Sequence, residues 1–161
     1  MAIGDITILD QSTMAGIGAR KFLVASGATT INPGEPVAKA LGAAVVTAAA
    51  TNTPVVATDY YAGIAATTST QTASVAGEVN VYPLVPGVEY LIKPKVAATF
   101  DTQAEYDALV GKRVLLDLTT GSYTILAADG ATNGCVIEAL DVAKYPGRVA
   151  FSFRNGVSYL A

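Results

Sequence analysis

The sequence predicts a mainly β fold: a small β-barrel or sandwich built from two similar β units, with one short helix and an extended N-terminal arm. Many short apolar runs alternate with Gly, Pro and Asn turn signals, which is typical of small all-β domains. A set of glycine-spaced segments occurs twice, and no linker or charge block divides the 161 residues. We expect residues 1–18 to form the arm and residues 19–161 a single β domain, with an internal repeat over approximately 31–84 and 110–154.

Each copy of the repeat consists of three short segments. They are residues 33–37, 62–65 and 76–81 in the first half, and residues 110–114, 133–137 and 146–151 in the second. The last glycine-to-glycine step is 14 residues in the first half (Gly63 to Gly77) and 13 in the second (Gly134 to Gly147). Each half therefore predicts three strands, each beside a glycine turn, and the two halves are expected to share one core.

In the first half, branched and aromatic residues predict strands over 22–25, 37–41, 58–66, 79–82 and 88–92. The alanines of 43–51 allow a helix, but Val45 and Val46 favour a strand there. The run Asn32-Pro33-Gly34 predicts a tight turn, because Pro fixes φ and Gly tolerates positive φ. Residues 67–74 are a polar Thr/Ser/Gln loop.

The second half is expected to contain the one helix. Thr102 and Glu105 match a capping box, in which each side chain bonds the backbone of the other residue. Tyr106 and Leu109 then share a face with Val110, and the glycine at 111 ends the helix. Strands are predicted over 114–118 and 122–127 as a hairpin, and over 135–140, 149–153 and 157–160. Alternation at 149–154 places the side chains of residues 149, 151 and 153 in the core.

The composition excludes several partners. The net charge is −3 and the ten Lys and Arg are scattered, so no basic surface is expected to attract nucleic acid. The longest mostly apolar run, residues 41–50, is too short to cross a membrane. From Ala40 to Gly77 the only charged side chain is Asp59. This stretch is expected to lie in the interior or under a partner, unless it is a Thr-rich surface that its hydroxyls keep solvated.

The residues needed for common catalytic chemistry are missing. Without His, neither a Ser-His-Asp nor a Cys-His arrangement can form within one chain. The single Cys135 lies in an apolar run and is expected to be a buried, inert thiol. Carboxylates are assigned to helix capping, the helix surface or water-facing strand positions: Asp101, Glu105, Asp107, Asp117 and Glu138. We expect no enzymatic activity, no cofactor and no metal site.

The repeat resembles the small capsid decoration (cement) proteins of tailed bacteriophages over about residues 31–154. The resemblance lies in a glycine and valine before a strand that ends in Asp, a short hairpin, an apolar strand ending in Glu-Ala, and a closing strand. These segments are Val110-Gly111-Lys112-Arg113-Val114-Leu115-Leu116-Asp117, Thr120-Gly121-Ser122-Tyr123-Thr124, Gly134-Cys135-Val136-Ile137-Glu138-Ala139-Leu140 and Gly147-Arg148-Val149-Ala150-Phe151. The long arm and the Thr-rich stretch from 47 to 74 depart from compact members of the family.

The resemblance implies a structural virion protein, made in the host bacterial cytoplasm and bound to the capsid exterior as a homotrimer. The major capsid protein is the expected partner, and the arm is expected to extend a neighbour's sheet by strand addition. The proposed docking side chains are Ile3, Ile6, Ile8, Leu9, Tyr60 and Tyr61. Two alternatives remain: a phage tail or baseplate β module, and a carbohydrate-binding module that uses Tyr60, Tyr61 or Tyr82.

Overall fold

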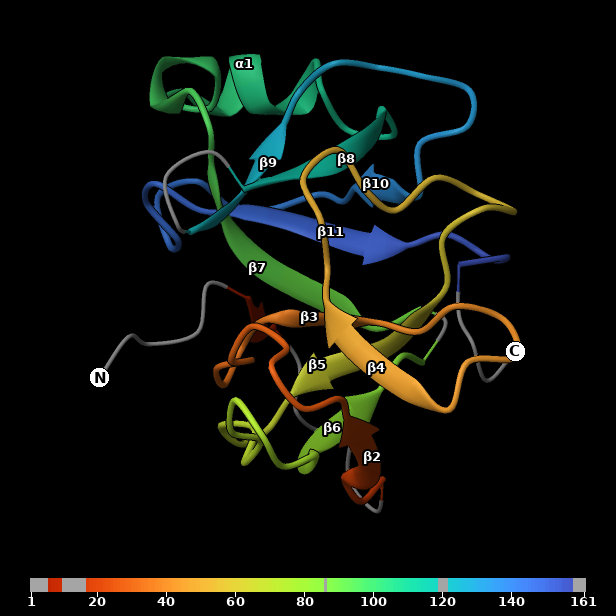
Figure 1. Cartoon of the computed structure of the whole chain (residues 1–161). Coiled ribbons are helices and arrows are strands. Elements are labelled where there is room, and N and C mark those ends of the chain that lie inside the picture. Colours follow the sequence, from red (N-terminus) through yellow and green to blue (C-terminus); the bar gives the residue numbers. More distant parts are fainter. Residues whose placement is uncertain (1–5, 10–16, 86, 119–121, 158–161) are drawn as a thin grey trace.

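The computed structural model, described here for residues 6–9, 17–85, 87–118 and 122–157, consists of two closed five-stranded β-barrels, one above the other in the view of Figure 1. The mainly β prediction is confirmed, and so are the two similar β units. The first barrel lies at the bottom of Figure 1 and the second at the top, with the helix α1 above it.

The strands of the first barrel follow one another in the order β2-β4-β3-β5-β6. Their bounds are β2 Arg20–Val24, β3 Pro36–Ala38, β4 Val45–Ala48, β5 Tyr61–Ala65 and β6 Gly77–Pro83. The second barrel has the order β7-β11-β10-β8-β9 and closes by a β7–β9 pairing. Its bounds are β7 Glu89–Pro94, β8 Arg113–Leu118, β9 Tyr123–Leu126, β10 Cys135–Ile137 and β11 Val149–Phe153. A further strand, β1 (Thr7–Ile8), pairs with β7 outside both barrels.

The two barrels have the same topology. Each is closed by one parallel pairing, β2 with β4 and β7 with β9, and its other pairings are antiparallel. The registers match as well. Phe22 pairs with Val79 in the first barrel and Ile92 with Val149 in the second, so Phe22 and Ile92 occupy equivalent positions. The duplication seen in the glycine spacing is therefore a duplication of strand order and register.

One detail of the predicted repeat is wrong by a residue. The sequence matched Gly63 with Gly134, but Gly63 pairs with Pro83 whereas Cys135 pairs with Phe153. Since Pro83 and Phe153 close equivalent strands, Gly63 is equivalent to Cys135. A register shift between Val37 and its neighbour in β3 accompanies this offset, which glycine counting could not detect.

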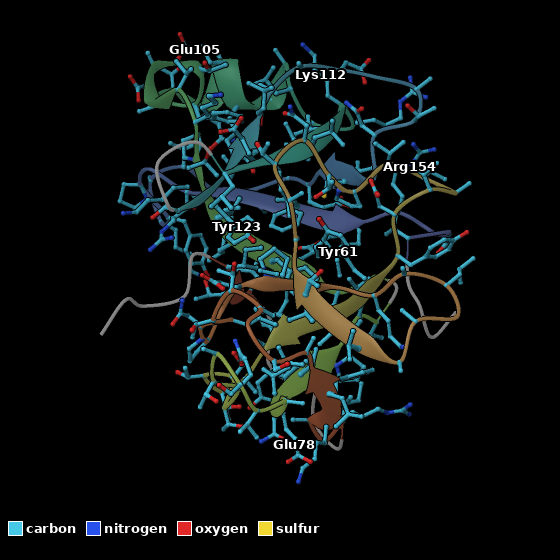
Figure 2. The ribbon with its side chains drawn as sticks, in the orientation of Figure 1. Tyr61, Glu78, Glu105, Lys112, Tyr123 and Arg154 are labelled. Carbon is cyan, nitrogen blue, oxygen red and sulfur yellow. The ribbon has the colours of Figure 1, made fainter. Side chains whose placement is uncertain are left out.

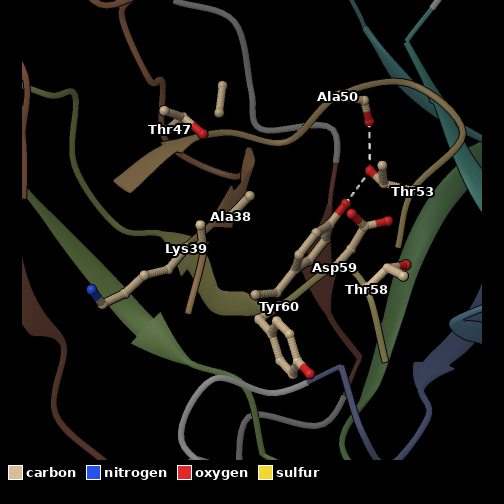
Figure 3. Close-up of a pocket in the computed structure, with 11 residues that line it drawn as sticks. Ala38, Lys39, Thr47, Ala50, Thr53, Thr58, Asp59 and Tyr60 are labelled. Atoms are coloured by element: carbon tan, nitrogen blue, oxygen red, sulfur yellow. Dashed lines mark hydrogen bonds between the residues drawn. The ribbon is translucent and has the colours of Figure 1, made fainter. Parts of the chain in front are cut away.

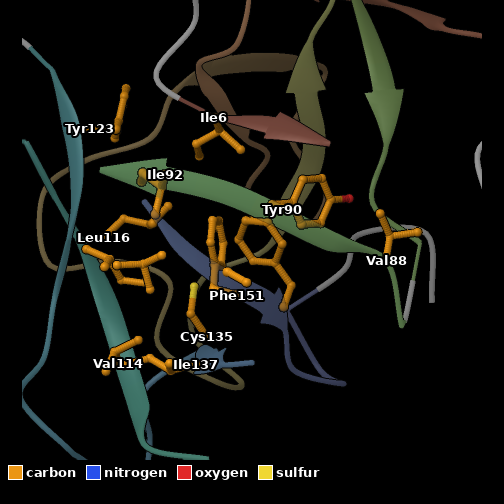
Figure 4. Packing of buried hydrophobic residues seen from close by; sticks show 14 of the residues in the cluster. Ile6, Val88, Tyr90, Ile92, Val114, Leu116, Tyr123, Cys135, Ile137 and Phe151 are labelled. Carbon is orange, nitrogen blue, oxygen red and sulfur yellow. The ribbon is translucent and has the colours of Figure 1, made fainter. Parts of the chain in front are cut away.

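The two halves do not share one core, as the repeat had suggested. The interior of the first barrel is a small aliphatic cluster of Val24, Ile31, Val37, Val46, Ala62, Ala65, Val79 and Val81. The second barrel holds the larger cluster, which is rich in aromatic rings (Figure 4). Phe151 lies at its centre, with its ring centroid 5.6 Å from that of Tyr90 and 5.2 Å from that of Phe153.

Strand β5 lies between the barrels, and all five of its residues are buried. Ala62 and Ala65 belong to the core of the first barrel, whereas Tyr61 and Ile64 pack into the core of the second. Figure 2 shows Tyr61 at this junction. Its ring centroid lies 5.7 Å from that of Phe153. Strand β5 therefore contributes side chains to both cores and joins the two barrels.

The segment 49–60, here called the strap, joins β4 to β5 by crossing the second barrel. Its backbone bonds β8 in both directions, from Asn52 N–H to Leu116 C=O (2.8 Å) and from Leu116 N–H to Thr53 C=O (2.8 Å). The Tyr123 hydroxyl donates to the Ala49 carbonyl at 2.6 Å. The strap therefore fastens one barrel to the wall of the other.

The helix α1 (Gln103–Asp107) covers one end of the second barrel, preceded by a short 3-10 turn, η1 (Ala97–Thr99). Its predicted capping box is present: the Thr102 hydroxyl accepts from the Glu105 N–H, and the Glu105 carboxylate accepts from the Thr102 N–H. Tyr106 and Leu109 are buried as expected, but Val110 is 40% exposed. The 119–121 turn of the predicted hairpin and residues 158–160 lie outside the described residues.

Candidate interaction surface

The described residues form no recognisable catalytic or metal centre. No group of three Cys, Asp or Glu side chains among them is placed to hold a metal ion. Cys135 is buried inside the second barrel, and burial raises the pKa of its thiol well above the usual value, so it stays protonated. The prediction of a buried thiol is confirmed. Burial likewise raises the pKa of Tyr90 and of Tyr106 to about 12, which keeps both phenols neutral.

The carboxylates considered for catalysis occupy exposed, capping or paired positions. Asp101 and Asp107 are exposed, and Glu105 completes the helix cap. Asp117 corrects an expectation, because it is buried rather than facing water, and its carboxylate pairs with the Lys95 ammonium at 2.8 Å. Glu138 is half-buried and accepts from the Ser152 hydroxyl. The alternation of residues in β8 suggested that Asp117 faces water. It could not show that Lys95, which follows β7, lies against this carboxylate.

The nearly uncharged stretch from Ala40 to Gly77 has several structural roles. Much of it is interior: β5 is buried on both faces, and the strap contributes buried Ala49 and Pro54. The loop 66–76 is mainly exposed, and Gly27 N–H bonds the Thr72 carbonyl across this end of the first barrel at 2.8 Å. Low charge thus reflects burial between the barrels together with a Thr-rich exposed loop.

The side chains predicted to dock a partner differ in how far they are buried. Ile6 is 3% exposed and Tyr61 is 0% exposed, so within this chain both side chains belong to the core and are not exposed for docking. Ile8 and Leu9 are half-buried against the second barrel. Ile3 lies outside the described residues. The arm therefore packs on its own chain at Ile6–Leu9 because its apolar side chains have a core to fill there.

Tyr60 and Tyr61 both contribute to one pocket but differ in burial, since Tyr61 is 0% exposed and Tyr60 is half-buried. The Tyr61 hydroxyl bonds the Thr53 hydroxyl inside the junction. Half-buried Tyr60 lines a shallow pocket of about 220 Å³ together with Lys39, Thr47 and Asp59 (Figure 3). Because Tyr61 is 0% exposed, its ring offers no accessible face beside Tyr60 for stacking on a sugar.

A different surface gathers around β1. On one side β1 pairs with β7, and the Leu9 N–H donates to the Glu89 carbonyl at 2.9 Å. On the other side the Ile6 N–H donates to the Gly34 carbonyl of the first barrel at 3.3 Å. Beyond that bond β1 and the first barrel diverge and leave an open groove of about 270 Å³. We call it the arm groove, lined by Ile6, Thr7, Ile8, Pro33, Gly34, Ile64, Ala65, Ala66 and Tyr82.

None of the described residues that line the arm groove is charged. Tyr82 is 41% exposed at its rim, and buried Ile64 forms part of its floor. Strand β1 is the first strand in its sheet, so its side away from β7 is a sheet edge. An edge beside an apolar groove suits an extended peptide, whose backbone bonds the edge while alternate side chains enter the groove.

Sequence reasoning selected the arm but missed the other residues of this groove. Pro33 was assigned only to a turn, and Tyr82 was assigned to an alternating strand and, in the carbohydrate-binding alternative, to sugar binding. The outward position of Tyr82 in β6 was readable from that alternation, whereas its proximity to the arm depends on the stacking of the two barrels.

Comparison with protein-family models, curated proteins and solved structures yields no match for this chain. Among the described helices, none has the length and apolar character needed to cross a membrane.

Proposed function

We propose that this chain is a structural virion protein that binds the outside of an icosahedral phage capsid and stabilises the lattice of the major capsid protein. The observation that carries the proposal is β1, a strand outside both barrels whose free edge borders an uncharged groove. A segment of the capsid protein is the proposed occupant of the arm groove.

The architecture suits a load-bearing role. Two closed barrels leave few sheet edges open, and the strap and β5 join them through buried contacts. The sequence resemblance to decoration proteins also supports a structural role on the capsid. We further propose a homotrimer on the capsid, because several linked contacts of modest strength together bind tightly.

The rim residue Tyr82 allows a direct test. Tyr82→Glu places a charge beside the apolar groove without disturbing a core, since the side chain is 41% exposed. We expect this variant to fold and to lose at least about tenfold in affinity for capsids that lack the protein, because a buried unpaired charge costs more than 1.4 kcal/mol. Binding is measured by co-sedimentation with such capsids.

Two controls sharpen the result. Val75→Glu adds the same charge at a 62% exposed position away from the groove lining and is expected to bind normally. Tyr60→Ala alters the separate Tyr60 pocket. Unchanged capsid binding by Tyr82→Glu would refute the groove as the docking site, and loss of binding by Tyr60→Ala instead would move the site to that pocket.

A further inference from the structure

The equivalence of the two barrels identifies a second strand-binding edge. In the second barrel, β1 pairs with the start of β7, Thr7 opposite Leu91 and Ile8 opposite Tyr90. The matched registers make Lys21 of β2 equivalent to Leu91 and Arg20 equivalent to Tyr90. On the side of β2 away from β6, β4 pairs only with the last two residues of β2, Leu23 and Val24. No strand in the described part of the chain pairs with Arg20 and Lys21 on that side.

The backbone of Lys21 faces this open side. Its partner in β6 is Asn80. The Asn80 carbonyl accepts from Ala66 N–H at 2.8 Å and its N–H donates to the Thr67 hydroxyl at 3.2 Å, so both groups point away from β2. The Lys21–Asn80 pair is thus of the non-hydrogen-bonded kind, and the N–H and C=O of Lys21 point outward from the barrel edge.

We propose that this edge binds the N-terminal strand of a second copy of the chain. The incoming strand pairs antiparallel with β2 as β1 does with β7, Thr7 opposite Lys21 and Ile8 opposite Arg20. The same segment already forms this kind of pairing within its own chain, so its compatibility with such an edge is shown by β1 itself.

The apolar contacts also have a counterpart. In the described pairing Ile6 lies one residue beyond Thr7, on the side of Ile92, and both are buried in the same core (Figure 4). The residue equivalent to Ile92 is Phe22, which is only partly buried against the core of the first barrel. An incoming Ile6 covers this ring and removes apolar surface from water.

Charge favours the edge of β2 over that of β7 for this strand. In the sequence the strand is flanked by Asp5 and Asp10. The β7 edge carries the acidic Glu89 at its start and the exposed basic Lys93 near its end, so its charges offset each other. The β2 edge instead offers Arg20 and Lys21, both exposed, although the Lys21 ammonium also pairs with Glu78 at 2.9 Å. Opposite charges across strands are attractive and like charges repel.

Disulfide trapping tests the pairing between copies. Ile8→Cys and Arg20→Cys are made in separate full-length chains, because non-hydrogen-bonded partners lie close enough for a disulfide. The native Cys135 is buried and does not compete. We expect the mixed pair to give about tenfold more cross-linked dimer under mild oxidation than Ile8→Cys mixed with the exposed control Val75→Cys.

The outcomes are distinct. Cross-linking no greater than the control overturns the proposal. A chain that carries both cysteines and forms only an internal disulfide also overturns it, because the arm then folds back on its own β2. If Ile8→Cys does not fold, the exposed pair Thr7→Cys and Lys21→Cys gives the same comparison.

The inference rests only on the homotrimer part of the proposed function. A donated strand leaves its own β7, so capsid binding through the arm groove is confined to copies whose strand stays on β7. Capsids are absent from this experiment, so its failure leaves capsid binding through the arm groove unaffected.

Discussion

Phe151→Ala is expected to lower the free energy of unfolding by about 3–5 kcal/mol, the usual cost of deleting a core aromatic ring. Phe151 is 0% exposed at the centre of the second barrel, between Tyr90 and Phe153. The variant leaves a cavity that these rings cannot fill without leaving their own contacts. Urea unfolding followed by far-ultraviolet circular dichroism measures the change.

Tyr82→Ala serves as the control for this experiment. Its ring is comparable in size but 41% exposed, so we expect a loss below about 1 kcal/mol. A loss of that small size for Phe151→Ala would mean that the side of β11 assigned to the core is wrong.

Among the described glycines, Gly63→Ala is expected to cause the largest loss of folding stability. A Cβ at Gly63 would lie 1.8 Å from the carbonyl oxygen of Tyr82, and the φ of +148° is one that side chains rarely adopt. The clash involves backbone of the neighbouring strand, so β5 and β6 would have to separate. We expect a loss above about 4 kcal/mol, measured by the same unfolding experiment.

Gly87→Ala separates the clash from backbone strain. Its φ is +81°, but a Cβ there would meet open space, so only the strain of about 1–2 kcal/mol remains. Equal losses for the two variants would show that β5 and β6 do not approach as closely as the structure has them.

The local elements were largely predictable because their signals lie within a few residues. The capping box needs only Thr102 and Glu105, and the alternation of β11 needs only its own residues. The valines of β4 correctly favoured a strand over a helix. Strand ends were less predictable: the strand predicted over 88–92 continues as β7 through Pro94, which pairs with Ile125.

The errors share a physical cause, which is contact between segments distant in the sequence. Tyr61 was assigned to a docking surface because nothing near it shows that β5 packs between two barrels. Ile6 was assigned to a free arm, but its side chain is buried in the core of the second barrel. Asp117 is buried because Lys95 reaches it. The repeat gave the strands of each half, but whether the halves close separately depends on the parallel β2–β4 and β7–β9 pairings.

The amount of this chain in purified DNA-filled heads that lack tails tests the proposed capsid role most directly. Quantitative mass spectrometry of such heads gives its ratio to the major capsid protein. A decoration protein is expected to be present at a near-stoichiometric ratio. Absence from tailless heads, with a few copies recovered in the tail or baseplate fraction, would contradict the capsid role and favour the tail module.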